Sequence, residues 1–176
     1  MKRRMALALA ALLAAALTGC SAQYTWETVE DFLPAQPVSA LAGAYRLDFA
    51  VPQDVQITEQ TADGSLCVYE QMDGAYEITA QTMLSSTPDG AIRRLTGFAP
   101  EQLPIIKTKR FGLRAYQLVW YCLGEEGGSL CRAAVVCDGN LCYTLSFSVR
   151  EEAGAQYAET AQAVFESLSL NAATEL

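Results

Sequence analysis

Residues 141–149 constrain the fold more than any other part of the sequence. Every second residue of this stretch is apolar, and the residues between them are small or polar. A period of two is typical of a β-strand with one apolar face. The residues that form this face are Leu141, Tyr143, Leu145, Phe147 and Val149. A strand of this kind needs cover of matching width, so the fold must place a second layer against the sheet.

The segment that follows this strand predicts the cover. Residues 151–168 are amphipathic with a helical period, and acidic and amide side chains occupy the outer side. The apolar stripe consists of Tyr157, Ala161, Val164, Phe165 and Leu168. We therefore expect a closing helix that packs on the apolar face of the strand at 141–149.

Alternation and turn residues predict the remaining strands. Asp73-Gly74 is a strong hairpin signal, and the last three strands form a meander. Thr87, Pro88 and Gly97 mark the start and the end of a short inserted helix. The predicted strands are 45–51, 66–71, 75–83, 104–109, 113–123, 129–137 and 141–150.

These elements predict an α+β fold in which an antiparallel β-sheet is sandwiched between helices. The second face of the sheet also needs cover, which the inserted helix or an N-terminal helix could give. Its apolar residues include Tyr116, Leu118 and Trp120. The N-terminal helix is predicted to end at Pro34, from the helical spacing of Trp26, Val29, Phe32 and Leu33.

The first twenty residues have the layout of a secretory signal. Three basic residues precede an apolar run at 5–17, which is too short to cross a membrane. The sequence Leu17-Thr18-Gly19-Cys20 then resembles the lipobox of bacterial lipoproteins. That resemblance implies cleavage before Cys20 and a diacylglyceryl group on its thiol, whereas the alternative is a plain signal peptide with a chance cysteine.

The domain organisation follows from these segments. We expect a signal peptide at 1–19, a lipid anchor with a short helix and linker at 20–44, one domain at 45–170 and a tail at 171–176. The mature chain would hold nine Lys and Arg against twenty Asp and Glu, a formal charge of −11. Nucleic acid is therefore not an expected partner. The expected location is extracytoplasmic, at the bacterial cell membrane.

Two stretches of the chain resemble a known family. These are "YRLDFAVP" at 45–52 and "GNLCYTLSFSVREEAGAQYAETAQAVFESLSL" at 139–170. In element order and in their strand and helix patterns they are similar to the PsbP-like domains, a group that includes the DcrB-type bacterial lipoproteins. The resemblance implies an α-β-α sandwich and a non-enzymatic accessory role in a larger complex. It implies no catalytic residue.

The residue types argue against an enzyme as well. The chain has no histidine, which removes the commonest general base and metal ligand. Glu125 and Glu126 are adjacent carboxylates, but a solvated hairpin tip accounts for them. The Asp-Gly pairs lack the spacing of a calcium loop and fit turns. We therefore expect no catalytic site, no cofactor and no metal.

Five cysteines besides Cys20 fall in the domain. A two-residue turn at Gly139-Asn140 would place Cys137 opposite Cys142, and a turn centred on Glu126-Gly127 would place Cys122 opposite Cys131. We predict both disulfides. The alternatives are a four-thiolate metal site, a redox role, or buried free thiols. Cys67 is the odd one, either a small core residue or half of an intermolecular bridge.

Six of the nine mature basic residues fall within 22 positions. They are Arg93, Arg94, Lys107, Lys109, Arg110 and Arg114. They form either a solvated surface whose charges deter edge pairing, or a docking patch for an anionic partner such as a protein, lipid headgroups or a wall polymer.

The sequence as a whole leaves two functions open. One is a non-catalytic, membrane-anchored docking module, and the other is a carrier that holds a small apolar or anionic ligand beside Tyr116, Leu118 and Trp120.

Overall fold

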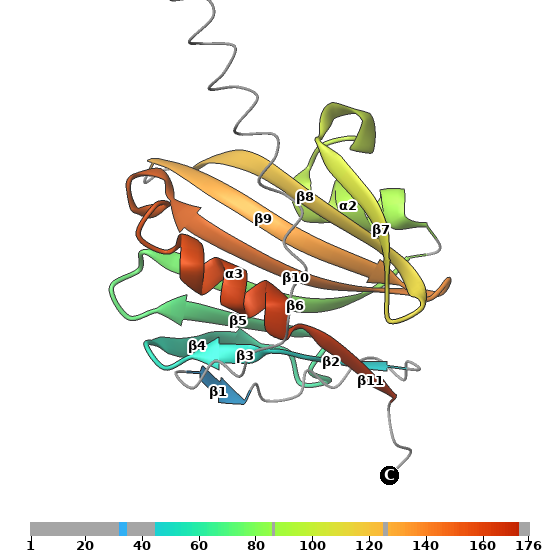
Figure 1. The fold of residues 1–176 in the computed structure, drawn as a ribbon, viewed down its shortest axis with the longest axis horizontal. Coiled ribbons are helices and arrows are strands. Elements are labelled where there is room, and N and C mark those ends of the chain that lie inside the picture. Colours follow the sequence, from blue (N-terminus) through green and yellow to red (C-terminus); the bar gives the residue numbers. More distant parts are fainter. Residues whose placement is uncertain (1–31, 35–44, 86, 125–126, 173–176) are drawn as a thin grey trace, which may run out of the picture.

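A seven-stranded antiparallel sheet forms the body of the protein (Figure 1). The computed structural model describes residues 32–34, 45–85, 87–124 and 127–172. The strand order is β4-β5-β6-β10-β9-β8-β7. The bounds are β4 Val55–Gln60, β5 Leu66–Gln71, β6 Tyr76–Leu84, β7 Ile105–Arg110, β8 Leu113–Gly124, β9 Gly127–Cys137 and β10 Leu141–Arg150.

Two small strand pairs lie beside the sheet. β1 (Phe32–Pro34) pairs with β3 (Ala50–Pro52), and β2 (Tyr45–Asp48) pairs with β11 (Ser169–Ala172). The remaining elements are the helices α2 (Pro88–Thr96) and α3 (Ala158–Ser167) and the 3₁₀ turns η1 (Pro100–Gln102) and η2 (Glu151–Ala153). No helix among the described residues combines the length and the apolar character needed to span a membrane.

One face of the sheet carries the larger core. The five apolar residues of β10 named above are buried there, and Val164, Phe165 and Leu168 of the α3 segment pack against them. Leu47 and Phe49, from β2 and the residue after it, close the same core. Tyr76 and Phe147 stack with ring centroids 4.8 Å apart. The strand at 141–150 and its helical cover are therefore placed as the sequence indicates.

The opposite face carries a second core beneath α2. Ala91 and Ile92 of α2 are fully buried against this face of β8 and β9. The helix begins at Thr87, whose hydroxyl accepts a hydrogen bond from the Gly90 amide at 3.2 Å. It ends at Gly97, whose φ of 78° suits glycine. The capping residues read from the sequence are confirmed.

The expected sandwich needs correction in its helical layers. The structure is mostly antiparallel sheet, and in its described part it holds α2 and α3 of nine and ten residues. Each helix covers only part of one face (Figure 1). The closing helix also starts later than expected, because Glu151–Ala153 forms a 3₁₀ turn before it.

The structure also contains strands where the sequence predicted none. Phe32–Pro34 is a strand instead of the end of a helix, while the rest of that predicted helix and the linker at 35–44 lie outside the described residues. β4 is an edge strand with five exposed residues, so it lacks the apolar alternation that signals a half-buried strand. β11 follows α3 directly and pairs with β2 over four residues.

Candidate functional site

The edge hairpin β7–β8 presents basic side chains on the sheet face that α2 covers. Lys107 pairs with Tyr116, and Lys109 lies directly opposite Arg114. Tyr116 packs against the core beneath α2, so Lys107, Lys109 and Arg114 project from that same face. All three basic residues are exposed.

Arg93 and Arg94 add to this surface from α2. Both are exposed and lie in the last turn of the helix, where the helix dipole favours positive charge. We call Arg93, Arg94, Lys107, Lys109 and Arg114 the basic surface. Among the described residues, none of the five is within ion-pair distance of a carboxylate, since the ion pair found there joins Arg46 to Asp48.

The electrostatics of the basic surface are unfavourable for the isolated domain. Like charges directly opposite each other on paired strands destabilise a sheet, and Lys109 and Arg114 form such a pair. No described carboxylate offsets this repulsion at ion-pair distance. Lys107, Lys109 and Arg114 thus share one face of the β7–β8 hairpin, and Arg93 and Arg94 lie on the helix that packs on this face.

Arg110 does not belong to this surface. Its Nη2 donates hydrogen bonds to the carbonyl oxygens of Phe165, Glu166 and Leu168 at 2.9, 3.4 and 3.2 Å. These are carbonyls at the carboxyl end of α3, which need donors from outside the helix. Burial, together with the nearby Arg132, lowers the pKa of the Arg110 guanidinium. Arg110 therefore links the β7–β8 hairpin to the closing helix.

The predicted disulfide at the β9–β10 turn is present in the structure. Cys137 and Cys142 are directly opposite, with Cα atoms 4.2 Å apart, and are bonded. Asp138 stabilises the same turn, since its carboxylate accepts hydrogen bonds from the amides of Asn140 and Leu141. Burial alone would raise the pKa of Asp138, but these amides and the Tyr143 hydroxyl hold it below the usual value.

The predicted Cys122–Cys131 disulfide is wrong. Both thiols are free, because β8 and β9 pair Cys131 with Trp120 and Cys122 with Ser129. Pairing continues to Gly124 and Gly127, so the hairpin is centred one residue earlier than the sequence suggested. Cys122 and Cys131 share a face but are diagonal neighbours, which is a poor geometry for a bridge.

The free thiols are poorly suited to chemistry. The pKa of Cys131 is raised to about 11, mainly by burial and also by the adjacent Cys122, against a lowering contact with Ser148. Burial also raises the pKa of Cys67, which lies in the larger core. A protonated thiol is a weak nucleophile at neutral pH. Within the described residues, no cluster of three potential ligands could hold a metal ion.

The residues expected to line a ligand cleft are packed into a core. Leu118 is 1% exposed and Trp120 is 8% exposed, and both contact the cluster that includes Ile92. Tyr116 is partly buried against the same cluster. The sheet and α2 therefore close on each other at this position, with side chains in place of a ligand.

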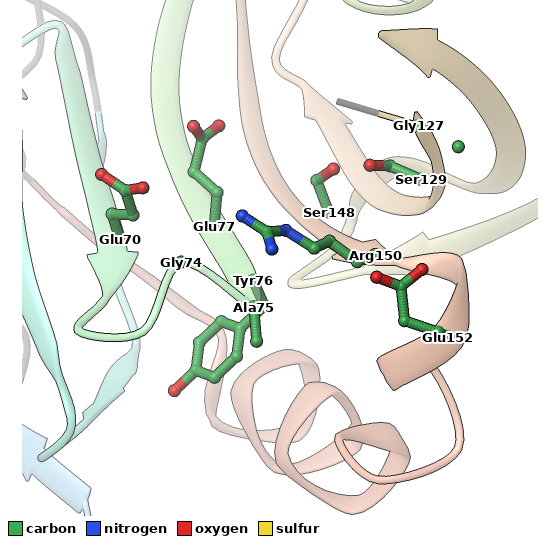
Figure 2. Close-up of a pocket in the computed structure, with 11 residues that line it drawn as sticks. Glu70, Gly74, Ala75, Tyr76, Glu77, Gly127, Ser129, Ser148, Arg150 and Glu152 are labelled. Atoms are coloured by element: carbon green, nitrogen blue, oxygen red, sulfur yellow. The ribbon is translucent and has the colours of Figure 1, made fainter. Parts of the chain in front are cut away.

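A pocket of about 300 Å³ lies elsewhere, where β5, β6 and β10 meet the β8–β9 hairpin (Figure 2). Its walls are polar. Glu70 and Glu77 are directly opposite each other on β5 and β6. The remaining lining includes Gly74, Ser129, Ser148, Arg150 and Glu152. Three carboxylates in one pocket are unfavourable for the anionic ligand considered from the sequence.

This pocket was not predicted from the sequence. The signal was present, because Glu70 and Glu77 are nearly equidistant from the Asp73-Gly74 turn and so had to face each other. The side on which they project was not predictable, since β5 has apolar residues on both faces, including Leu66, Val68 and Tyr69. Cys20, the lipidation candidate, and the pair Glu125 and Glu126 lie outside the described residues.

Two solved structures share the architecture at low sequence identity. Cyanobacterial PsbP (CyanoP) from Synechocystis sp. PCC 6803 superposes with a TM-score of 0.55 at 12% identity, over 85% of this chain and 99% of that chain. The fold is PsbP-like. LpqN of Mycobacterium tuberculosis, involved in cell envelope biogenesis, has a TM-score of 0.50 at 15% identity, over 77% of this chain and 90% of that one. No family model and no curated protein matches the sequence.

The PsbP-like fold explains why the two cores are buried, but it does not indicate which exposed residues have a function. This chain shares few identical residues with CyanoP or with LpqN, so the likeness concerns the backbone arrangement alone. What distinguishes this chain is which side chains its fold exposes. On that ground the basic surface and the polar pocket are the features to explain.

The two neighbours Lys109 and Arg110 should respond differently to loss of charge. Arg110→Met removes three hydrogen bonds from a charged donor, so we expect it to lower the free energy of unfolding by about 1–3 kcal/mol. Lys109→Met should change it by less than about 0.5 kcal/mol or raise it slightly, because an exposed like-charge contact is lost. Urea denaturation followed by circular dichroism measures both. Equal effects would contradict the assigned roles.

The cysteine assignment predicts a labelling pattern. When the protein is denatured without reductant and treated with iodoacetamide, Cys67, Cys122 and Cys131 should be alkylated, and Cys137 and Cys142 should stay unmodified. After reduction all five should react. Peptide mass spectrometry locates the modification, and protection of Cys122 and Cys131 in the unreduced sample would show that they are bridged after all.

Proposed function

We propose that this protein is a non-catalytic accessory lipoprotein, anchored by Cys20 at the outer face of a bacterial membrane, whose basic surface docks on an anionic partner. The observation that carries the proposal is a set of five exposed basic residues, none of them in an ion pair within the described part of the chain, on a chain whose mature charge would be −11. Cations concentrated on one side of an acidic protein orient it toward an anionic partner and suppress binding through other surfaces.

The absence of catalytic chemistry is part of this proposal. Histidine is missing from the whole chain, and the described thiols include a buried group whose pKa is raised to about 11. Neither CyanoP nor LpqN is described as an enzyme. These features support an accessory role, in which the protein acts by binding.

Three further features support the location. The Leu17-Thr18-Gly19-Cys20 sequence follows a basic and apolar leader, as in lipoproteins. The Cys137–Cys142 disulfide suits an oxidising compartment outside the cytoplasm. LpqN, which shares the fold, is involved in cell envelope biogenesis. A lipid-anchored domain exposed to the cell envelope agrees with all three.

The carrier alternative retains one specific observation, the polar pocket of about 300 Å³. It differs from the ligand site expected from the sequence in place and in chemistry. The apolar side chains expected to hold a ligand are buried beneath α2. A carrier function would therefore have to use the carboxylate-lined pocket.

Cross-linking in living cells tests the docking function. Tagged full-length protein would be compared with a variant in which Lys107, Lys109 and Arg114 are each changed to Gln. The control changes the exposed residues Gln53, Gln56 and Gln60 to Glu. Both variants lower the net charge by the same amount, but the control does so on the opposite edge of the sheet. Circular dichroism establishes that both fold.

We expect the natural protein and the control to capture the same partner, and the basic-surface variant to lose at least 80–90% of it, because each pair of opposite charges at an interface contributes about 1 kcal/mol. A Cys20→Ser form should lose capture as well if the partner is met at the membrane. Equal capture by the control and the basic-surface variant would contradict the proposal.

A further inference from the structure

We propose that the anionic partner of the basic surface is a phospholipid surface, and that Phe111 at the tip of the β7–β8 hairpin enters its interfacial region. This inference rests on the proposed function, because it names the partner of the same surface.

The tip of the hairpin holds an aromatic residue at a positive φ, a backbone conformation that favours glycine, asparagine or aspartate. Phe111 has a φ of 55° and Gly112 a φ of 77°. Glycine takes this conformation readily, and Asn or Asp tolerate it, but a bulky side chain there is uncommon and costs free energy. A strained residue of this kind points to a functional constraint. Stability of the turn does not account for the phenylalanine.

The fold does not bury the Phe111 ring. Its side chain is 38% exposed, and the Arg110 guanidinium lies over the ring at 5.2 Å from its centroid. Arg110 is itself held by the carbonyls at the end of α3. The ring is therefore attached to a rigid part of the domain. An aromatic ring on a rigid tip is well suited to the interface between lipid headgroups and acyl chains.

The surroundings of the tip combine cations with exposed apolar side chains. Lys109 and Arg114 form the cross-strand pair next to the turn, and Lys107 follows on the same face. Ile106, on the other face of the same hairpin, is 63% exposed. Leu84 is 70% exposed at the end of β6, next to the β9–β10 turn at the same end of the sheet. An acidic protein would need the charges alone, whereas a lipid interface accepts both.

Two carboxylates at this end of the domain do not pair with the charges of the basic surface. Asp89 lies in the first turn of α2 and is exposed, and Asp138 lies in the β9–β10 turn with its oxygens engaged by two amides and the Tyr143 hydroxyl. Neither is in an ion pair with the basic surface within the described part of the chain. Lys107, Lys109 and Arg114 therefore keep their positive charge unpaired by any described carboxylate at ion-pair distance.

The chain between the predicted lipid on Cys20 and Phe32 tethers the domain, so that even a weak contact between the hairpin and the headgroups would be occupied. Cys20 precedes Phe32, the first described residue, by twelve positions. An extended chain of that length spans at most about 40 Å. The predicted lipid would thus hold the domain within about one tether length of the headgroups, where the effective concentration of the lipid surface is high. A lipid chain combined with a basic patch is a common two-part membrane attachment.

Vesicle sedimentation tests the inference with the lipid anchor removed. The whole mature chain, residues 20–176 carrying Cys20→Ser, would be mixed with one of two kinds of vesicle. One kind is phosphatidylcholine alone, and the other contains about 40% phosphatidylglycerol, which gives an anionic surface. We expect binding to the anionic vesicles, weakened by 0.5 M salt because the Debye length shrinks, and little binding to phosphatidylcholine.

Matched variants locate the contact. Lys107→Gln with Lys109→Gln should weaken binding about twenty-fold, since each basic residue near an anionic surface contributes roughly fivefold. Gln56→Glu with Gln60→Glu lowers the net charge equally on the β4 edge and should leave binding within about twofold. Phe111→Asn, which suits the positive φ, should weaken binding without lowering the melting temperature.

The outcomes separate this inference from the proposed function. Equal binding to both vesicle types, or equal losses in the two charge-matched pairs, would overturn the lipid inference. The docking function would then stand or fall on the cross-linking result, and a protein captured only through the basic surface would identify an acidic protein as the partner. Binding lost in Lys107→Gln/Lys109→Gln and in Phe111→Asn alone supports the lipid surface.

Discussion

Burial of β10 on both faces is the constraint on which the rest of the structure depends. One face of this strand fills the larger core with five apolar side chains, and the other buries Cys142 and Thr144. A central strand of this kind needs paired neighbours on both edges, which β6 and β9 supply over nine residues each. It also needs cover on both faces: α3 with the β2–β3 segment covers the larger core, and α2 contributes to the core that includes Cys142.

The arrangement around β10 determines which surfaces are left for function. Because both cores are filled by the chain's own side chains, a ligand cannot enter between α2 and the sheet without displacing Leu118 or Trp120. The surfaces left for function are then the sheet edges, the turns and the polar part of one sheet face, where side chains of β5, β6, β9 and β10 line the pocket. The basic surface lies at one edge, and the carboxylate-lined pocket lies on the polar part. The PsbP-like backbone thus serves as a scaffold that positions them.

Local patterns predicted most of the central sheet. The strands at 66–71 and 141–150 were located to the residue, and the cap at Thr87 and the end at Gly97 were correct, because each depends on neighbours in sequence. The Cys137–Cys142 bridge followed from a two-residue turn. The Cys122–Cys131 bridge failed because a glycine-rich turn permits more than one register, and tertiary packing chooses between them.

The elements that carry the basic residues were predictable from the sequence, but the contacts of these residues were not. Spacing along β7 placed Lys107 and Lys109 on one face, and the helix carrying Arg93 and Arg94 was correctly located. That Arg110 binds the end of α3 could not be read from the sequence, since the contact joins residues more than fifty positions apart. The edge strand β4 was missed for a related reason, because exposure removes the alternation that identifies strands.

Photo-cross-linking in intact cells tests most directly the claim that β7 faces the partner. A photoreactive amino acid would replace Lys109 on β7 or Thr58 on β4, which are exposed residues on the two opposite edges of the sheet. Adducts, to protein or to lipid, are expected from position 109 and few from position 58. Adducts of equal yield from both positions, or from position 58 alone, would contradict this claim.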